Sequence, residues 1–442
     1  MQARTLGVIS LGCNKNRVDS ELALGVMKEH GWTPTSDPAQ AQVILVNTCG
    51  FIGPAKEESI NTILEMAAYK ETGRCELLAV TGCLAQRYAE DLLREIPEID
   101  LLLGVNQYDH LPEAVETALR ERGRPVLQAD PETFFEHERV LTTPAWTAYI
   151  RIGEGCSNRC TFCAIPLIRG PYRSRDREAI LSEVRGFARQ GVREHILVAQ
   201  DTTRWGTDHG GHSQLPGLVR DCAAIEGVDW LRVLYCYPDE TDERLLDAMA
   251  ELPNVCPYLD LPVQHISDPI LRRMRRRGDS GDIRRCLRLA RERGLTLRTS
   301  LIVGFPGETE EQFRELIDFV EEAQFDRMGA FAYSAEEGTP AARLPDQIPE
   351  EVKQERLDRL MRLQASISRK KNQALVGSTL KVLVTDVSGS RALGRSEREA
   401  PESDGEIRFS CGRPVAPGSF VPVRITQAGT YDLSGVLEEV AP

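Results

Sequence analysis

Short apolar runs alternate with amphipathic helical segments over the first 120 residues of the chain. The runs are TLGVISLGC, VILVNTC, LLAVTGC and LLLGV, and the segments between them, such as SELALGVMKEHG and LAQRYAEDLLREI, repeat apolar residues at helical spacing. Alternation of this kind is typical of a parallel sheet with helices on both faces. The pattern therefore predicts an α/β domain with a flavodoxin-like parallel sheet over residues 3–120.

The alternation resumes at residue 146 and continues to residue 334. The strand candidates are TAYIRIG, HILVAQD, WLRVLYCY, YLDLPVQ, TLRTSLIVGF and MGAFAYS. Six such units fit a partial (β/α)6 barrel as well as an open sheet, and the periodicity does not choose between these two architectures. A Pro-rich stretch at 335–349 precedes a long polar helix over 350–372. This helix ends a central domain of residues 142–372.

After residue 377 the pattern changes to short β runs that are separated by Gly and Ser turns. These runs are TLKVLVTDV, EIRFSC, SFVPVRITQA and YDLSGVLEEV. They predict a small antiparallel, OB-like β-barrel over residues 375–441. Residues 121–141 carry Gly, Pro and charged positions and connect the first two domains, so the length of the chain fits about three domains.

Composition excludes several classes of protein. The sequence has no run of 18 or more apolar residues, which argues against a membrane span, and its N-terminus lacks a secretory signal pattern. We therefore expect a cytoplasmic protein without a membrane partner. The net charge of −13 argues against a protein that nucleic acid holds mainly by charge. In a chain of this length, twelve cysteines are more typical of ligands, reactive thiols or core residues than of disulfides.

Three cysteines lie within eight residues after the first strand of the central domain, in RIGEGCSNRCTFCAIP: Cys156, Cys160 and Cys163. Thiolates are soft ligands that select zinc or iron–sulfur clusters. Three thiolates can hold three corners of a [4Fe–4S] cluster and leave one iron open to a small molecule. A structural zinc site would need a fourth protein ligand, for which His137 is the nearest upstream histidine. The spacing favours the cluster.

A second set of cysteines is defined by position, and its members are Cys13, Cys49 and Cys83. Each follows an apolar run directly, and ligands of open α/β sheets bind outside the carboxyl ends of the strands. We therefore expect the three thiols to converge on a second three-cysteine site with one open iron. Gly12, Gly50 and Gly82 flank them, where the backbone would have to approach closely. The alternative is three buried core cysteines.

The central CxxxCxxC motif, with Phe162 before its last cysteine, resembles the motif of the radical S-adenosylmethionine (SAM) enzymes. The resemblance implies a partial (β/α)6 barrel in which the open iron of the cluster chelates SAM. One electron from an external donor then yields a 5′-deoxyadenosyl radical, which abstracts hydrogen from an unactivated carbon. The three cluster cysteines would thereby be catalytic.

Further cofactor contacts are implied at the carboxyl ends of the barrel strands, where the active sites of such barrels gather. The expected contacts are Phe162, Gln200, Gly304 and Glu308. For Gly304 and Glu308, roles in forming a turn and capping a helix are an equally good interpretation. Three arginines after the cluster loop could orient a carboxylate or form a salt-bridged segment: Arg169, Arg173 and Arg175.

With its N-terminal three-cysteine domain and its small C-terminal barrel, the chain resembles the methylthiotransferase family over essentially its whole length. In that family a second cluster supplies or carries the sulfur, and a second SAM supplies the methyl group. The resemblance therefore implies two [4Fe–4S] clusters, each held by three cysteines. It also implies that the C-terminal module is a TRAM domain.

The methylthiotransferases include two branches with different substrates. One branch modifies an aspartate β-carbon in small-subunit ribosomal protein number twelve, and the MiaB-like branch modifies a transfer-RNA adenosine. The stretches SLGCNKNRVDSE, AQDTTRWG, LDLPVQHISDPILRRM and FAYSAEEGTPAARL resemble the first branch. The transfer-RNA branch usually carries Gln-Met-Asn after its first cysteine, where this chain has Asn14, Lys15 and Asn16. The ribosomal protein, either free or within the assembled subunit, is therefore the expected substrate.

Charge agrees with this choice of branch. From residue 375 onward the chain has seven basic and nine acidic residues and three aromatic ones, whereas a nucleic-acid barrel normally offers a positive groove and stacking aromatics. Such a module could hold a basic ribosomal protein by complementary charge. The segment GRSEREAPESDG departs from the branch pattern at Glu399 and Ser403.

The arginine run at 270–278 could meet RNA phosphates or form the solvated face of a helix. A metal-stabilised nucleic-acid-binding module without catalysis is the alternative from another functional class.

Overall fold

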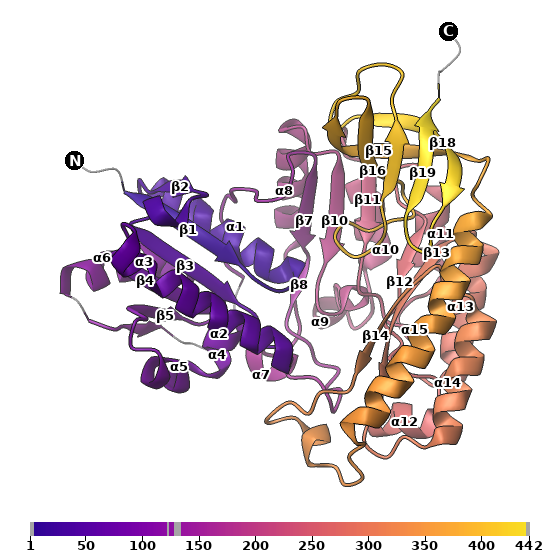
Figure 1. Cartoon of the computed structure of the whole chain (residues 1–442), viewed down its shortest axis with the longest axis horizontal. Helices are drawn as coiled ribbons and strands as arrows, with labels where there is room; N and C mark the ends of the chain where they lie inside the picture. Colours follow the sequence, from indigo (N-terminus) through magenta and orange to yellow (C-terminus); the bar gives the residue numbers. More distant parts are fainter. Residues whose placement is uncertain (1–3, 122, 128–133, 439–442) are drawn as a thin grey trace.

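The chain folds into three parts that pack against one another (Figure 1). The computed structural model describes residues 4–121, 123–127 and 134–438. The predicted first residue of the N-terminal domain, residue 3, and the predicted last residue of the C-terminal domain, residue 441, lie outside the described residues. In the described part of the chain, no helix combines the length and the apolar character that crossing a membrane would need.

The N-terminal part is a six-stranded parallel sheet with helices on both faces. Its spatial order, β2-β1-β3-β4-β5-β6, is the flavodoxin order with one more strand at the edge. The strands are β1 (Thr5–Ser10), β2 (Thr33–Thr35), β3 (Val43–Thr48), β4 (Leu77–Gly82), β5 (Leu101–Leu103) and β6 (Val126–Leu127). The helices are α1 (Asn14–Glu29), α2 (Gly53–Ala67), α3 (Tyr69–Thr72), α4 (Cys83–Arg87), α5 (Ala89–Glu95) and α6 (Leu111–Glu121).

Side-chain alternation explains why both faces of this sheet are covered. Along β3, Val43 and Leu45 pack on one face with α1 and α6, whereas Ile44 and Val46 pack on the other with α2. Helix α1 is buried on two sides, because Val18 and Leu22 also pack against the central domain. The helix that begins directly after Cys13 therefore lies between the N-terminal sheet and the barrel.

The central part is a partial barrel of six parallel strands. The strands form two halves, β11-β10-β7 and β12-β13-β14, and a bridge between Leu231 and Val255 joins them. The six strands thus follow one another in chain order, without the reversal of order that a doubly wound open sheet shows, and this order indicates the partial barrel. The barrel strands are β7 (Thr147–Arg151), β10 (Glu194–Val198), β11 (Trp230–Val233), β12 (Tyr258–Asp260), β13 (Thr296–Val303) and β14 (Arg327–Ala332), and β8 (Gly153–Glu154) pairs with β9 (Arg173–Ser174).

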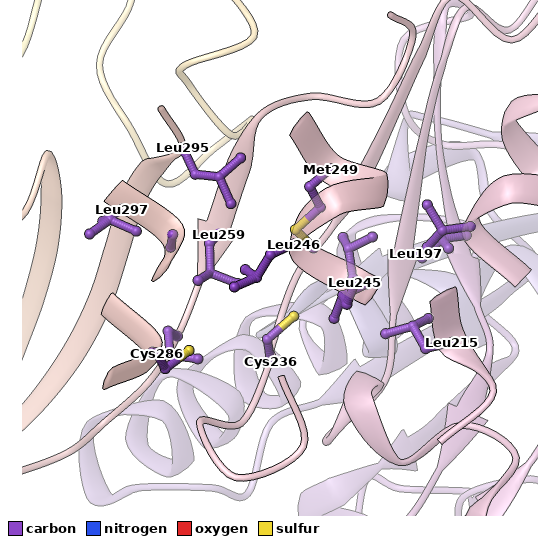
Figure 2. Close-up of a cluster of buried hydrophobic side chains, with 14 of the residues drawn as sticks. Leu197, Leu215, Cys236, Leu245, Leu246, Met249, Leu259, Cys286, Leu295 and Leu297 are labelled. Carbon is purple, nitrogen blue, oxygen red and sulfur yellow. The ribbon is translucent and has the colours of Figure 1, made fainter. Parts of the chain in front are cut away.

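Helices cover the outer face of the barrel and bury its main core. Figure 2 shows Leu197 and Leu259 of the strands beside Leu245 and Met249 of α11, with Cys236 in the same apolar cluster. Cys236 and Cys286 are thus structural. The helices are α7 (Ile165–Arg169), α8 (Arg177–Arg189), α9 (Thr207–Gly210), α10 (Leu215–Ala223), α11 (Glu243–Glu251), α12 (Asp268–Arg273), α13 (Ser280–Glu292), α14 (Glu310–Ala323) and α15 (Glu350–Gln373).

The C-terminal part is a closed five-stranded barrel in the order β15-β16-β17-β19-β18. Four pairings are antiparallel, but β17 and β19 are parallel. The prediction of an antiparallel barrel is corrected at this pair, because an odd number of strands cannot alternate in direction around a closed ring. The strands are β15 (Thr379–Ser388), β16 (Arg391–Arg395), β17 (Ile407–Ser410), β18 (Phe420–Ala428) and β19 (Leu433–Leu437).

This C-terminal module covers the amino ends of the central strands. Glu194, the first residue of β10, accepts from Arg395 at 2.6 Å, and Arg327, the first residue of β14, pairs with Glu399 at 2.7 Å. Glu399, one of the two departures noted in the sequence, is therefore buried and anchored. The module leaves the carboxyl ends of these strands uncovered, and the N-terminal domain packs there. The active sites of βα barrels lie at this end.

Candidate active site

All six cysteines of the two predicted sets line one cavity of about 860 Å³ between the N-terminal domain and the barrel. Cys13, Cys49 and Cys83 come from the carboxyl ends of β1, β3 and β4. The other three follow β7 and the short strand β8. The two cysteine sets, which follow strands of two different domains, therefore line the same cavity.

Backbone geometry at the N-terminal set explains its flanking glycines. Gly12 has a φ of +83°, and a Cβ at this position would lie 3.0 Å from the Cys49 Sγ. At Gly50 a Cβ would lie 2.8 Å from the backbone of Leu84. A larger residue at either position would push the cysteine loops apart, so the predicted close approach is present.

Burial disfavours the charged form of several of these thiols, in both sets. It raises the pKa of Cys49 to about 12 and the pKa of Cys156 to about 11. The same cause raises the pKa of Cys83, and the adjacent Arg169 opposes it. Such thiols become ligands only when a metal displaces their protons.

The chemistry of the donors fits iron–sulfur clusters. Each set offers three thiols to the cavity, and thiolates are the usual ligands of such clusters. Within the residues described, no group of His, Cys, Asp or Glu side chains has the arrangement of a ready single-ion site. His137, the fourth zinc ligand considered from the sequence, lies with its Nε2 3.0 Å from Glu29 and its Nδ1 3.2 Å from the Glu138 carbonyl oxygen. It does not join the cysteines.

The other predicted contacts divide into two groups. Phe162 and Gln200 line the cavity, and the Gln200 amide donates to Glu154 at 2.6 Å. Gly304 and Glu308 do not line it. The Glu308 carboxylate accepts from the Gly304 N–H and from Arg356, which supports the role in a turn for this pair and does not support a cofactor contact.

The three arginines after the cluster loop have different environments. Arg169 lines the cavity and is fully buried. Arg175 lies away from the cavity and pairs with Glu136 and Glu183. Arg173 donates to the Pro171 carbonyl at 3.0 Å. Only Arg169 is thus placed to act at the site.

Arg169 belongs to an ion-pair network that joins the two domains beside the thiols. Its guanidinium donates to Asp19 of α1 at 2.7 Å and to Glu154 of the barrel at 3.2 Å. Arg151 bridges the same two carboxylates at 2.6 and 2.9 Å. Burial acts to raise the pKa of Glu154, but Arg169 and Arg151 hold it below its usual range. The network fixes the two cysteine sets relative to each other.

A second bridge between the domains lies on another wall of the cavity. The Glu336 carboxylate accepts from the Gly53 N–H at 3.1 Å and from Lys56 at 2.7 Å. Arg87 also pairs with it, at 3.3 Å. Glu336 lies in the stretch FAYSAEEGTPAARL, so the sequence marks this segment but not its partners, which lie 249 to 283 residues away.

Sequence reasoning gave no role at the site to several side chains of the cavity wall, among them Lys15, Tyr235, Tyr237 and Arg276. The Arg276 guanidinium lies 4.1 Å from the Tyr237 ring centroid, and its Nη1 lies 3.8 Å from the Cys160 Sγ. Arg276 belongs to the arginine run at 270–278. This run does not form one surface, because α12 ends at Arg273 and Arg276 turns into the cavity.

Comparison with known proteins connects this geometry to a family. Family models match three parts of the chain: the radical SAM superfamily over residues 150–320, an uncharacterized protein family (UPF0004) over 5–104, and the TRAM domain over 376–437. The ribosomal protein uS12 methylthiotransferase RimO of Desulforamulus reducens is 50% identical over 442 residues, with 98% of this chain and 100% of that protein covered. The chain belongs to the RimO family.

Other relatives and structures agree with this membership. RimO of Clostridium botulinum strain Loch Maree is 49% identical over 440 residues and covers 99% of both chains. Among solved structures, the radical SAM methyltransferase TsrM from Kitasatospora setae matches with a TM-score of 0.57 at 15% identity, over 87% of this chain and 79% of that one. At this identity the match shows the fold alone. The RimO relatives do not favour the transfer-RNA branch or a non-catalytic binding module.

Proposed function

We propose that this protein is a radical SAM methylthiotransferase that acts on ribosomal protein uS12. The observation that carries the proposal is the convergence of two three-cysteine sets on one cavity in a chain of the RimO family. A methylthiotransferase needs a site that makes a carbon radical and a site that delivers sulfur to it. One shared cavity brings the two sites within reach of one substrate carbon.

The cysteines divide between two metal centres in this proposal. Cys156, Cys160 and Cys163 would hold a [4Fe–4S] cluster whose open iron takes SAM, and Cys13, Cys49 and Cys83 would hold a second cluster. When bound, the first cluster and SAM supply the 5′-deoxyadenosyl radical, with an electron from an external donor, and the second cluster supplies or carries the sulfur. The aspartate β-carbon of uS12, free or within the ribosomal subunit, is the proposed acceptor.

The chain itself provides a shielded and rigid space for this chemistry. Phe162, Ile302 and Ala330 give the cavity an apolar wall, which limits the water and the side-chain hydrogen donors near a reactive carbon. The Arg169 network and the Glu336 bridge hold the N-terminal domain over the carboxyl ends of the barrel strands. These residues orient the sites and do not themselves exchange atoms with the substrate.

The choice of substrate is tested by deleting the gene and analysing both candidate substrates by mass spectrometry. The proposal predicts that uS12 loses a methylthio group while transfer-RNA nucleosides keep their pattern. Loss from a transfer-RNA nucleoside, with uS12 unchanged, would contradict it.

The assignment of the radical site has its own test. Reductive cleavage of SAM by the reconstituted protein should disappear in Cys160→Ala and persist in Cys411→Ala. Cys411 is a matched control because it is a half-buried cysteine of the C-terminal module, away from the cavity. Cleavage that persists in Cys160→Ala would show that the radical site is elsewhere.

A further inference from the structure

Lys15 presents a buried cation that has no anionic partner in the described part of the chain. The residue is 7% exposed and lines the shared cavity. Its ammonium lies 3.1 Å from the centroid of the Tyr235 ring, which lines the same cavity. No other described residue hydrogen-bonds to this ammonium or pairs with it. A buried cation without a counter-ion is costly, so its place at a binding cavity points to an anionic ligand.

Three other cations of the cavity wall differ from Lys15 in this respect. Arg169 pairs with Asp19 at 2.7 Å, Arg298 with Asp260 at 2.7 Å, and Lys353 with Glu350 at 3.2 Å. Their charges are neutralised within the protein. Lys15 has only the face of an aromatic ring, which stabilises a cation less than a carboxylate does.

The carboxylates of the cavity wall do not compensate Lys15 either. Glu336 is occupied by Lys56, Arg87 and the Gly53 N–H. Glu350 accepts from Lys353 and from Gln354. The positive charge of Lys15 is therefore available to a ligand.

The side chain is also held in place before a ligand arrives. Lys15 lies in the first turn of α1, which is clamped between the N-terminal sheet and the barrel. The Tyr235 hydroxyl accepts a hydrogen bond from the Asn14 side-chain amide at 3.3 Å. The Tyr235 backbone N–H donates to the Asp260 carboxylate at 3.0 Å. Tyr235 has a φ of +63°, a sparsely populated conformation that its surroundings must stabilise. A fixed ammonium loses little freedom on binding.

Position decides between two carboxylates that could bind here, that of SAM and that of the substrate aspartate. Lys15 is two residues from Cys13 of the N-terminal set. The set proposed to take SAM has its own cation, Arg276, whose Nη1 lies 3.8 Å from the Cys160 Sγ. Arg159, which also lines the cavity, lies within the CxxxCxxC loop. The cation nearest in sequence to the proposed sulfur site is thus Lys15.

We propose that Lys15 binds the side-chain carboxylate of the substrate aspartate and so selects an acidic side chain at the reacting position. This inference rests on the proposed function. The contact places the ammonium against the carboxyl group that is bonded to the modified β-carbon, on the side of the N-terminal cysteines. Sequence reasoning marked Lys15 only as a departure from the Gln-Met-Asn pattern, and the structure supplies a role for it.

The test measures binding of two forms of purified uS12, with either Asp or Asn at the modified position, to the anaerobically reconstituted full-length enzyme. The wild-type enzyme should bind the Asp form about tenfold more tightly, which corresponds to about 1.4 kcal/mol. In Lys15→Met the affinity for the Asp form should fall to that for the Asn form. Lys15→Arg should restore most of the preference, and Lys28→Met, an exposed change on the same helix, should not alter it.

Further measurements separate the alternatives. SAM affinity and SAM cleavage without uS12 should be unchanged in Lys15→Met, and iron content and circular dichroism should confirm that the variant folds. If Lys15→Met misfolds, Lys15→Gln replaces it in the same assay. A Lys15→Met enzyme that still prefers the Asp form, or that loses SAM affinity instead, would overturn the inference. Wild-type enzyme that binds neither form of uS12 would overturn the proposed function and, with it, the inference.

Discussion

The guanidinium of Arg169 donates to the carboxylate of Asp19 at 2.7 Å, across the boundary between the barrel and the N-terminal domain. The same group lies 3.5 Å from the Sγ of Cys83. Arg169 follows the loop of one cysteine set, and Asp19 lies in the second turn of α1, the helix that begins directly after Cys13 of the other set. This single contact therefore couples the positions of the two proposed metal centres.

Loss of the Arg169 contact should destabilise the protein strongly. In Arg169→Gln, Asp19 and Glu154 lose a buried partner, and removal of one member of a buried ion pair typically costs about 3–5 kcal/mol. Urea unfolding followed by circular dichroism measures the change. Arg94→Gln is the control, because its pair with Asp91 is exposed to solvent and such surface pairs contribute little to stability. Equal losses in the two variants would contradict the account of this network.

Iron content should divide equally between the two cysteine sets. Two [4Fe–4S] clusters give about eight irons per reconstituted chain. Replacing Cys13, Cys49 and Cys83 together by Ala should leave about four, and so should replacing Cys156, Cys160 and Cys163. Cys411→Ala should keep the full content. A triple variant of the N-terminal set that retains all the iron would show that this set holds no cluster.

Stability should rise with pH between about 5 and 7 because of His195. Burial lowers the pKa of His195 to about 4 from its ordinary value near 6.5, and the side chain is fully buried. Between these values the unfolded chain binds the proton and the folded chain does not, so acidification favours unfolding. The free energy of unfolding should fall by about 2 kcal/mol more from pH 7 to 5 in wild type than in His195→Leu. The exposed change His212→Leu should leave the pH dependence as in wild type, and an unchanged slope in His195→Leu would contradict the prediction.

The C-terminal module should loosen when Glu194 is neutralised. Glu194 is buried between Arg395 and Arg232. Burial acts to raise its pKa, but these arginines hold it below its usual range. Glu194→Gln leaves both guanidiniums without a counter-ion, at a cost of about 3–5 kcal/mol. Backbone hydrogen exchange should become faster in β15 and β16 of Glu194→Gln. The control is Glu406→Gln, which changes an exposed glutamate. Equal protection in the two variants would argue against this docking contact.

The periodicity of apolar residues predicted the helices, the strands and the two cysteine sets, because all of these depend on residues that are close in sequence. An apolar run that ends in cysteine places the thiol at a strand end, and parallel strands bring their ends to one edge. Long-range contacts lie outside such reasoning. Two examples are the Leu231–Val255 bridge, which joins the two halves of the central sheet, and the approach of Lys15 to Tyr235 across 220 residues of sequence.

Glu308 shows the converse case, in which the sequence fits a cofactor contact and a role in a turn equally well, and in the structure its carboxylate accepts from the Gly304 N–H and from Arg356. Spacing alone does not separate these two roles. The arginine run at 270–278 was ambiguous for a related reason, since the end of α12 turns Arg276 inward. The residue at which the helix ends therefore determines which arginines of the run face solvent and which face the cavity.

The most direct test of the whole account is mass spectrometry of purified uS12 after incubation with the reconstituted enzyme, SAM and a reductant. The account predicts that the modified aspartate gains one methylthio group in place of hydrogen, and that the gain is absent when either cysteine set is replaced by alanine. A uS12 product that forms without the N-terminal cysteines, or that carries no sulfur, would contradict the central claim that two three-cysteine sites act on one substrate carbon.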